Sequence, residues 1–395
     1  MNDYHIFQSP QNIIYGKGSF EIVGKEAKRR GKKALIISDQ TMLSLGFVDQ
    51  CCSYLQQVSI ESVVYLGVVT EPNDQYVAEA LDICRSEFCD VVISIGGGSC
   101  IDTAKAVAVV SANGAYIGDY INGNKQPSHP SLPHIAIPTT AGTGSEVTDV
   151  TVITNSTNDV KMMIKQPVFL PTVAIVDPTL TLSSPTQITA STGIDALCHS
   201  IEAYLSRKAH PLTNTLALSS MKLLYDHLPI VYREGSNINA REAMALGSLQ
   251  AGLAFSNASV CLVHGMSRPI GALFHVPHGL SNAMLLPVVL HFSKGECMEQ
   301  LASIANVICP DQHFPSTMEA ADFTVEAIEK LCETLEIPNL KQWGITKDEY
   351  MKAIPKMVND AMESGSPDNN PRVPTIEELK VLYEDCYDYH FLMNH

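Results

Sequence analysis

Residues 90–110 read DVVISIGGGSCIDTAKAVAVV, and this stretch decides the fold class. The apolar run from Val91 to Ile95 predicts a buried parallel strand. Three glycines follow it, and a helical pattern begins near Ser99, with Asp102 in the first turn, where a carboxylate is favourable. Glycines let a backbone approach a phosphate closely, and the free N–H groups of a helix N-terminus attract anions. GGGS alone often forms only a tight turn, but between a buried strand and a helix it predicts a phosphate-binding loop.

The segments around this stretch continue the alternation of strand and helix. We expect strands at 33–39, 60–67 and 172–177, a helix at 75–85, and a strand–loop–strand unit at 134–154. The Thr/Gly/Ser-rich loop of the last segment either surrounds the phosphates and riboses of a cofactor or forms a surface turn. The pattern predicts an open α/β sheet, although GGGS differs from the usual GxGxxG dinucleotide motif.

The character of the sequence changes beyond Pro185, where helical patterns replace strands. These patterns cover 186–206, 213–232, 239–257, 260–273, 297–309, 317–335, 347–362 and 375–388. We therefore predict an α/β domain at 1–184 and an all-helical domain at 185–395.

Composition restricts the class of protein. The chain has 395 residues, 45% of them apolar, and a net charge of −16, which argues against nucleic acid or an anionic membrane as partner. No apolar run has the length of a membrane span, and the polar N-terminus does not resemble a signal peptide. The 11 cysteines show no regular spacing, which indicates reduced thiols in a cytoplasmic protein, with Cys198 a packing residue.

The segment TGIDALCH, residues 192–199, predicts part of a metal site. Asp195 and His199 are four residues apart, so on a helix they lie on one face. His264 and His278 follow 14 residues apart, which leaves room for a helix and a turn. One Asp with three His suits Fe(II) or Zn(II), although a lone Asp-x₃-His pair is more often a capped or solvated helix face.

Five motifs together resemble the iron-containing (group III) alcohol dehydrogenases, the family of lactaldehyde reductase and 1,3-propanediol dehydrogenase. They are GGGSCIDTAK, PTTAGTGSEVT, DPTLTLSSPTQITASTGIDALCHSIEAY, HGMSRPIGALFHVPHGLSNAMLLP and DNNPRVPT. The resemblance extends over nearly the whole chain. It implies an N-terminal Rossmann-like α/β domain and an all-α C-terminal domain, the dehydroquinate synthase-like fold, with the active site between them.

The resemblance also implies the site residues. The metal ligands are expected to be Asp195, His199, His264 and His278, with Fe(II) as the preferred metal and Zn(II) as the second choice. Residues at NAD-contacting positions are Asp39, Gly97, Gly98, Ser99, Thr139, Thr140, Val152 and Lys161. Asp39 is expected to accept hydrogen bonds from the ribose and to repel the 2′-phosphate of NADP. Lys161 is equally well explained as a solvated lysine.

The expected activity is an NAD-linked alcohol dehydrogenase or aldehyde reductase. The metal acts as a Lewis acid on the alcohol or carbonyl oxygen, and hydride passes between the substrate carbon and the nicotinamide. The partner is a small alcohol or aldehyde, and the family resemblance implies a homo-oligomer.

One position departs from the family. Many members have a second histidine four residues after the first ligand of the HGM segment, but this chain has Arg268, which cannot relay a proton. His275 is a tentative substitute, or else a structural histidine. Pro269 is expected to end the helix at that point. Arg268 is then either part of a structural ion pair or a clamp for an anionic group, and as a clamp it makes a hydroxy-acid dehydrogenase the alternative function.

Two other classes compete with this interpretation. A metal-dependent hydrolase or lyase would use the same four ligands, but hydrolysis needs neither Asp39 nor the glycine loop. A catalytically inactive metal- or nucleotide-binding protein would not need four intact ligands. Absorbance of reduced nicotinamide with a panel of short alcohols and hydroxy acids separates the three classes.

Overall fold

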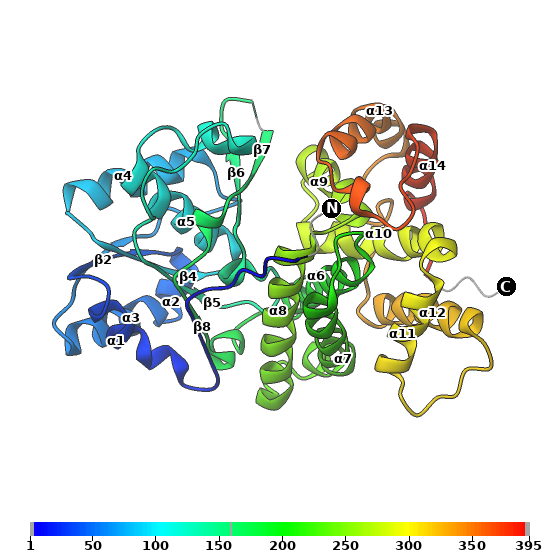
Figure 1. Cartoon of the computed structure of the whole chain (residues 1–395), viewed down its shortest axis with the longest axis horizontal. Coiled ribbons are helices and arrows are strands. Elements are labelled where there is room, and N and C mark those ends of the chain that lie inside the picture. The colour runs from blue at the N-terminus through cyan, green and yellow to red at the C-terminus, as the bar shows by residue number, and fades with distance from the viewer. Residues whose placement is uncertain (1–3, 159, 392–395) are drawn as a thin grey trace. The chain divides into compact units, whose positions relative to one another are not determined.

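The computed structural model describes residues 4–158 and 160–391, which form two compact units (Figure 1). The sheet unit runs from Gln8 to Ser184, and the helical unit begins at Pro185. The described residues before Gln8 also belong to the helical unit, where the ring of His5 stacks on that of His210 with centroids 4.6 Å apart. The sequence analysis had assigned these first residues to the α/β domain, and the stacking explains the difference.

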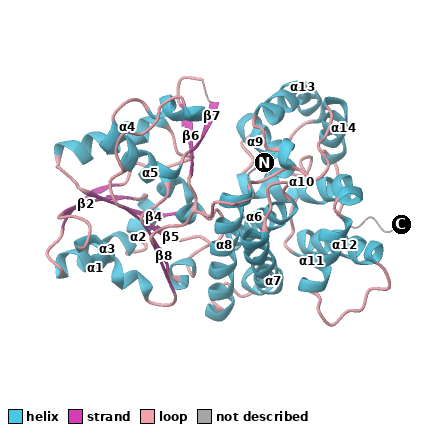
Figure 2. Cartoon of the chain, viewed as in Figure 1, coloured by secondary structure: helices cyan, strands magenta, loops and turns pink. Residues whose placement is uncertain are grey.

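A parallel six-stranded sheet forms the centre of the sheet unit, with strand order β1-β8-β5-β4-β2-β3. The strands are β1 (Asn12–Tyr15), β2 (Lys33–Ile37), β3 (Glu61–Tyr65), β4 (Val91–Gly96), β5 (His134–Pro138) and β8 (Val173–Val176). A separate antiparallel pair is formed by β6 (Val150–Asn155) and β7 (Val160–Lys165). The predicted α/β fold class is confirmed, and Figure 2 shows the long strands within this unit.

The sheet is covered on both faces because its strands are apolar on both sides. On β2, Leu35 and Ile37 pack with α4 (Asp74–Ser86) and α5 (Gly98–Asn113). Ala34 and Ile36 point to the other face, where they join residues of α1 (Val23–Lys28) and α3 (Phe47–Gln57). This alternation produces one core on each side of the sheet.

The strand order places a topological switch at the edge where the glycine loop lies. The chain goes from β2 outward to β3 and then returns to the opposite side of β2 with β4. In open α/β sheets, ligands bind at the carboxyl ends of the strands beside such a switch. The segment 97–99 follows β4, and Asp39 lies just after β2, so both lie at this point.

The helical unit contains the remaining long helices. They are α6 (Thr186–Leu205), α7 (Pro211–Arg233), α8 (Ile238–Ala258), α9 (Leu262–Phe274), α10 (His278–Ser293), α11 (Met298–Ile308), α12 (Thr317–Thr334), α13 (Lys347–Glu363) and α14 (Ile376–Cys386). Helix α6 packs against α7, α8 and α10, and α9 packs against α10 and α13. Within the described part of the chain no single helix has the length and apolar content of a membrane span, and α8 with α9 meets that test only as a pair bent by 102°.

Short elements complete both units. Helix α2 (Gln40–Ser44) lies in the sheet unit, together with 3₁₀ turns at Ser19–Ile22, Ile117–Gly123, Ser145–Val147, Pro167–Phe169 and Pro178–Thr181. The helical unit has 3₁₀ turns at Lys294–Glu296 and at η7 (Pro367–Asn369).

Two predictions about helices were wrong. No helix was expected at 278–293, because α10 is apolar on all sides and therefore lacks an amphipathic period. Pro269 was expected to end its helix, yet α9 continues to Phe274. A proline inside a helix removes one backbone hydrogen bond, and here packing against neighbouring helices outweighs that loss.

Candidate metal centre

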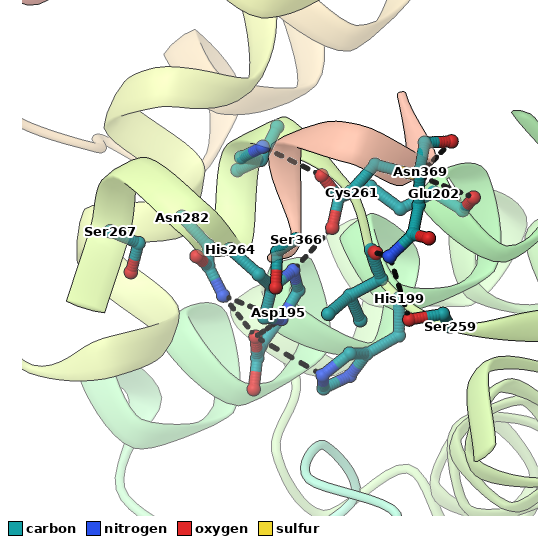
Figure 3. Close-up of polar contacts among 12 residues, drawn as sticks. Asp195, His199, Glu202, Ser259, Cys261, His264, Ser267, Asn282, Ser366 and Asn369 are labelled. Carbon is teal, nitrogen blue, oxygen red and sulfur yellow. Dashed lines mark hydrogen bonds and ion pairs between the residues drawn. The ribbon is translucent and has the colours of Figure 1, made fainter. Parts of the chain in front are cut away.

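Three helices of the helical unit bring four ligand-type side chains together. Figure 3 labels three of them, Asp195, His199 and His264. Asp195 and His199 lie one turn apart on α6, His264 is in the first turn of α9, and His278 is the first residue of α10. One ligand atom from each lies within 4.8 Å of the others. The side chains predicted as ligands therefore form one cluster.

A glycine allows α10 to begin so close to α6. A Cβ atom on Gly279 would lie 2.2 Å from the backbone oxygen of Ser191 and 3.0 Å from Cβ of Asp195. Only a residue without a side chain permits this approach. The contact fixes the preceding residue, His278, beside Asp195.

The ligand atoms surround a common centre. Oδ1 of Asp195 lies 3.7 Å from Nε2 of His264, 3.9 Å from Nε2 of His278 and 4.0 Å from Nε2 of His199. These separations suit donors around one transition-metal ion, since metal–ligand bonds are about 2.0–2.2 Å long. A carboxylate with three imidazoles suits Fe(II) or Zn(II).

Asn282 contacts three of the four ligand side chains. Its Nδ2 donates to Oδ1 of Asp195 at 2.6 Å and lies 3.1 Å from Nε2 of His264 and 3.3 Å from Nε2 of His278. The Oδ1 atom of Asn282 is buried and has no hydrogen bond within the described residues. The NH2 group thus faces three ligand atoms, so these acceptor atoms converge on one point, as ligands of a cation do.

The electrostatics of the site favour positive charge. Burial alone would raise the pKa of Asp195, but His199, His278 and His264 outweigh it and lower this pKa well below its usual value. Burial alone would lower the pKa of His264, but the carboxylates of Glu202 and Asp195 raise it to about 9. A cluster that stabilises a proton so strongly fits a metal cation in its place.

Glu202 is a functional residue that the sequence analysis missed. It lies on α6 one turn after His199, and its Oε2 is 2.5 Å from Nδ1 of His264 (Figure 3). Its Oε1 accepts a hydrogen bond of 2.7 Å from the backbone N–H of Val263. Because an ionised carboxylate can only accept hydrogen bonds, Nδ1 of His264 must carry the hydrogen and donate it to Glu202. This bond orients the ring so that Nε2 of His264 faces Asp195. The spacing from His199 was a usable signal, because residues three apart share a helix face.

We expect Glu202→Gln to weaken metal binding by about 10–100-fold, because the ring of His264 loses the group that orients it. Metal affinity measured by competition with a chelator checks this. Glu329→Gln is the matched control, since Glu329 is also a buried glutamate that pairs with a histidine, His291, at 3.1 Å. Equal affinities for the two variants would remove Glu202 from the site.

A second trio of possible ligands is formed by Cys198, Glu202 and His264, again within 4.8 Å. Both carboxylate oxygens of Glu202 already accept hydrogen bonds, and burial raises the pKa of the Cys198 thiol well above its usual value. A thiol that stays protonated is a poor ligand. Cys198 therefore fits the packing role predicted for it.

Arg268 and His275, noted at the family's variable position, are not members of the four-residue ligand cluster. Arg268 is on α9 one turn after His264, and its Nη1 donates to Oγ of Ser366 at 3.0 Å. His275 ends α9 in a left-handed conformation, with φ 53°, and its side chain is exposed. No hydrogen bond of the His275 ring occurs among the described residues, so it resembles neither a ligand nor a hydrogen-bonded structural histidine.

The sheet unit brings most of the predicted cofactor residues to one edge. Oδ1 of Asp39 caps α2 by accepting from Met42 N–H at 2.9 Å. A Cβ atom on Gly96 would lie 3.6 Å from Oδ2 of Asp39, so the carboxylate borders the glycine turn. Gly97 is the N-cap of α5 and provides no side-chain cap, which leaves the first N–H groups of this helix available to a ligand.

The Thr/Gly/Ser-rich loop after β5 lies at the same edge of the sheet as the glycine turn. Thr139 donates its backbone N–H to the oxygen of Gly96 at 3.0 Å, and Thr140 lies beside Gly97. These contacts bring together the residues after β4 and β5, namely Gly97, Gly98, Ser99, Thr139 and Thr140. Lys161 lies on β7, where its Nζ pairs with Glu71 at 3.1 Å.

Two charged residues of α5 hold the loop between β5 and β6. Asp102 accepts from Oγ of Ser145 at 2.5 Å and from the backbone N–H of Val152 at 2.8 Å. Nζ of the buried Lys105 donates to Oγ1 of Thr148 at 2.9 Å and to the oxygen of Val150 at 2.7 Å. From the sequence, Asp102 was noted only as a residue of the first helical turn, and Lys105 was not considered. Their hydrogen-bond partners lie beyond β5, too far along the chain for a local pattern to show them.

Family models match both units. The model described as iron-containing alcohol dehydrogenase covers residues 10–178, and the C-terminal model of the same family covers 189–387. The NAD-dependent methanol dehydrogenase of Bacillus methanolicus is 37% identical over 384 residues, which are 97% of this chain and 99% of that protein.

Solved structures agree with the family models. A crystal structure of 1,3-propanediol oxidoreductase is 34% identical, with a TM-score of 0.93 over 97% of this chain and 100% of the other. Sulfoacetaldehyde reductase from Bifidobacterium kashiwanohense, in complex with NAD⁺, is 30% identical, with a TM-score of 0.86 over 98% and 99% of the two chains. The protein is thus an oxidoreductase that belongs to the iron-containing alcohol dehydrogenase family.

Proposed function

We propose that the protein is a metal-dependent, NAD-linked enzyme that interconverts a small alcohol and its aldehyde. The observation that carries this proposal is the cluster of Asp195, His199, His264 and His278, whose ligand atoms share one centre. Family membership favours Fe(II) as the resident metal, and the donor set also accepts Zn(II).

The residues of the helical unit have separate tasks in this chemistry. A divalent cation held by the four ligands supplies a Lewis acid for a hydroxyl or carbonyl oxygen. Asp195 contributes the negative charge, and its hydrogen bond from Asn282 fixes the carboxylate. Glu202 orients His264, so that the substrate meets a site whose geometry is already set.

The edge of the sheet unit is the proposed site for NAD. The N-terminus of α5 and the glycine turn suit the pyrophosphate, and Asp39 suits the ribose hydroxyls. Thr139, Thr140 and Val152 would contact the cofactor from the neighbouring loop and strand. Lys161 can contact the cofactor only if its ion pair with Glu71 breaks.

Asp39→Gly is expected to shift the preference from NAD toward NADP. The change removes the ribose acceptor and the repulsion of a 2′-phosphate, so the ratio of kcat/KM for the two cofactors should move by about 10–100-fold. Asp39→Asn, which keeps an N-cap for α2, separates the effect of charge from loss of the cap. Asp49→Asn removes an exposed carboxylate of the same unit and is the control. Equal use of both cofactors by the unmodified protein would refute the role of Asp39.

The decisive experiment follows reduced nicotinamide by its absorbance. Protein reconstituted with Fe(II) or Zn(II) is assayed with NAD⁺ and a panel of short alcohols, and in reverse with NADH and aldehydes. Turnover that needs both metal and NAD supports the proposal, whereas turnover of ester or phosphate substrates without NAD would favour a hydrolase.

Cytoplasmic location and a homo-oligomeric state remain predictions.

The relatives do not select one substrate. Their names include methanol, 1,3-propanediol and sulfoacetaldehyde, which range from neutral molecules to one with an anionic sulfonate. The choice must therefore come from residues of this chain that differ within the family.

A further inference from the structure

Arg268 extends the ligand-bearing face of α9. It follows His264 by four residues in an unbroken helix, so the two side chains leave the same face. Side chains of a helix also lean toward its N-terminus, which directs a long arginine back over the turn that carries His264. The backbone positions of Arg268 and His264 are therefore one helical turn, about 5–6 Å along the axis, apart.

Arg268 has no carboxylate partner within 4.0 Å among the described residues. Its one hydrogen bond is to a neutral hydroxyl, from Nη1 to Oγ of Ser366 at 3.0 Å. Two other arginines are paired with acids: Arg30 with Glu26 at 2.6 Å and Arg372 with Glu378 at 2.6 Å. A guanidinium has five N–H donors, so most of those on Arg268 remain available for a ligand.

The carboxylate of Glu202 acts on Arg268 electrostatically but forms no ion pair with it within 4.0 Å. Burial lowers the pKa of Arg268, and Glu202 acts in the opposite direction. Both oxygens of Glu202 are already used by Nδ1 of His264 and the N–H of Val263. A partly buried cation without an ion pair is costly, and an anionic ligand would remove that cost.

We propose that Arg268 is the specificity-determining residue for an anionic substrate, and that it binds a carboxylate or sulfonate at the far end of a short alcohol or aldehyde. This proposal rests on the function proposed above for the same metal centre. His264 and Arg268 are one helical turn apart on α9. This spacing suits a substrate with about two or three bonds between the reacting carbon and the anionic group. A carboxylate and a sulfonate each offer two oxygens that can accept parallel N–H bonds from a guanidinium.

The reaction itself is unchanged by the anionic end. The primary alcohol loses one hydride from carbon to NAD⁺ and one proton from oxygen, which gives the aldehyde, NADH and H⁺. The carboxylate or sulfonate keeps its charge throughout, because Arg268 only holds it. A hydroxy acid and its neutral isostere therefore undergo the same chemistry and differ only in this contact.

The test compares isosteric pairs of substrates in the metal-loaded protein. 3-Hydroxypropanoate is paired with isoamyl alcohol, and isethionate with neohexyl alcohol (3,3-dimethylbutan-1-ol), so that shape is kept and charge is removed. We expect kcat/KM to favour the anionic member, and Arg268→Gln to lower the anionic-to-neutral ratio by about 100-fold, equivalent to about 3 kcal/mol. Arg268→Lys should retain an intermediate ratio, since it keeps charge but loses the bidentate fork. Arg372→Gln removes an equally charged group from a surface ion pair and should leave the ratio unchanged.

A binding measurement separates this role from general damage to the protein. Propanoate or ethanesulfonate, added with NAD⁺, should raise the Tm of the unmodified protein and of Arg372→Gln but not of Arg268→Gln. An unchanged substrate ratio in Arg268→Gln overturns the proposal, including the case in which only the KM for NAD⁺ rises, which would assign Arg268 to a cofactor phosphate. If no alcohol of either kind is oxidised by the metal-loaded protein, the proposed function itself fails, and that result is distinct from an unchanged ratio.

Discussion

Replacing His264 by alanine is expected to abolish both metal retention and turnover. Its Nε2 lies 3.7 Å from Oδ1 of Asp195, and the side chain is only 3% exposed, so no other group can take its place. Loss of one of four donors should remove several kcal/mol of Lewis-acid stabilisation and lower kcat/KM by at least about 1000-fold. Elemental analysis after gel filtration reports the metal, and the initial rate of NADH formation reports activity.

Two controls make this result specific. His313→Ala removes an exposed histidine of the same unit and should retain metal and rate. Treatment of the unmodified protein with a chelator should abolish activity, and added Fe(II) or Zn(II) should restore it, whereas His264→Ala should not recover. Native rates in metal-free protein would show that the cluster is not catalytic.

Lys105→Met is expected to destabilise the sheet unit by about 3–5 kcal/mol, the usual cost of breaking a buried charged pair. Lys105 is 1% exposed and ties α5 to the loop before β6, and without it the largely buried carboxylate of Asp102 loses the cation 3.9 Å away. The loop carries predicted cofactor positions, so the KM for NAD should also rise. Chemical denaturation measures the first effect, and Lys33→Met, which breaks a surface pair with Glu87, should cost only about 0–1 kcal/mol.

The same lysine gives the stability a pH dependence with a defined sign. Burial lowers the pKa of Lys105 from 10.5 to about 8, although Asp102, Asp149 and Glu146 oppose the shift. Between these two values the unfolded chain binds more protons than the folded one, so this group makes stability rise with pH. Lys105→Met should lack this increase in the free energy of unfolding between about pH 8 and pH 10.5. If the free energy of unfolding changed with pH equally in both proteins, the assignment to Lys105 would be contradicted.

Much of the fold was predictable because long elements carry strong periods. The buried strand before the glycine turn, the α/β alternation and most helices of the second half follow from apolar spacing. The edge strand β1 has four residues, too short for a period to show. Helix α10 was missed for the opposite reason, since it is apolar on every side. Strand order, and with it the switch between β2 and β4, depends on pairing that no local pattern encodes.

The candidate site divides in the same way. Asp195 and His199 were paired by their spacing within one helix. His264 and His278 were added as candidates by residue type and by the room between them, and the family resemblance then implied the same four ligands. Glu202 could have been found from its place on α6. Asn282 and the isolation of Arg268 could not, because they depend on how α9, α10 and the segment at Ser366 meet in space.

Helix α6 carries Asp195, His199 and Glu202 on one face, and this arrangement limits how the gene can change. An inserted or deleted codon between Asp195 and Glu202 would turn everything after it by about 100° around the helix axis. A change of length before His199 would turn this ligand away from Asp195, and a change anywhere in the window would turn Glu202 away from His264. Substitutions within this window change one contact at a time, but a change of its length moves every later residue at once. Over evolutionary time the window should therefore accept replacements while keeping its length fixed.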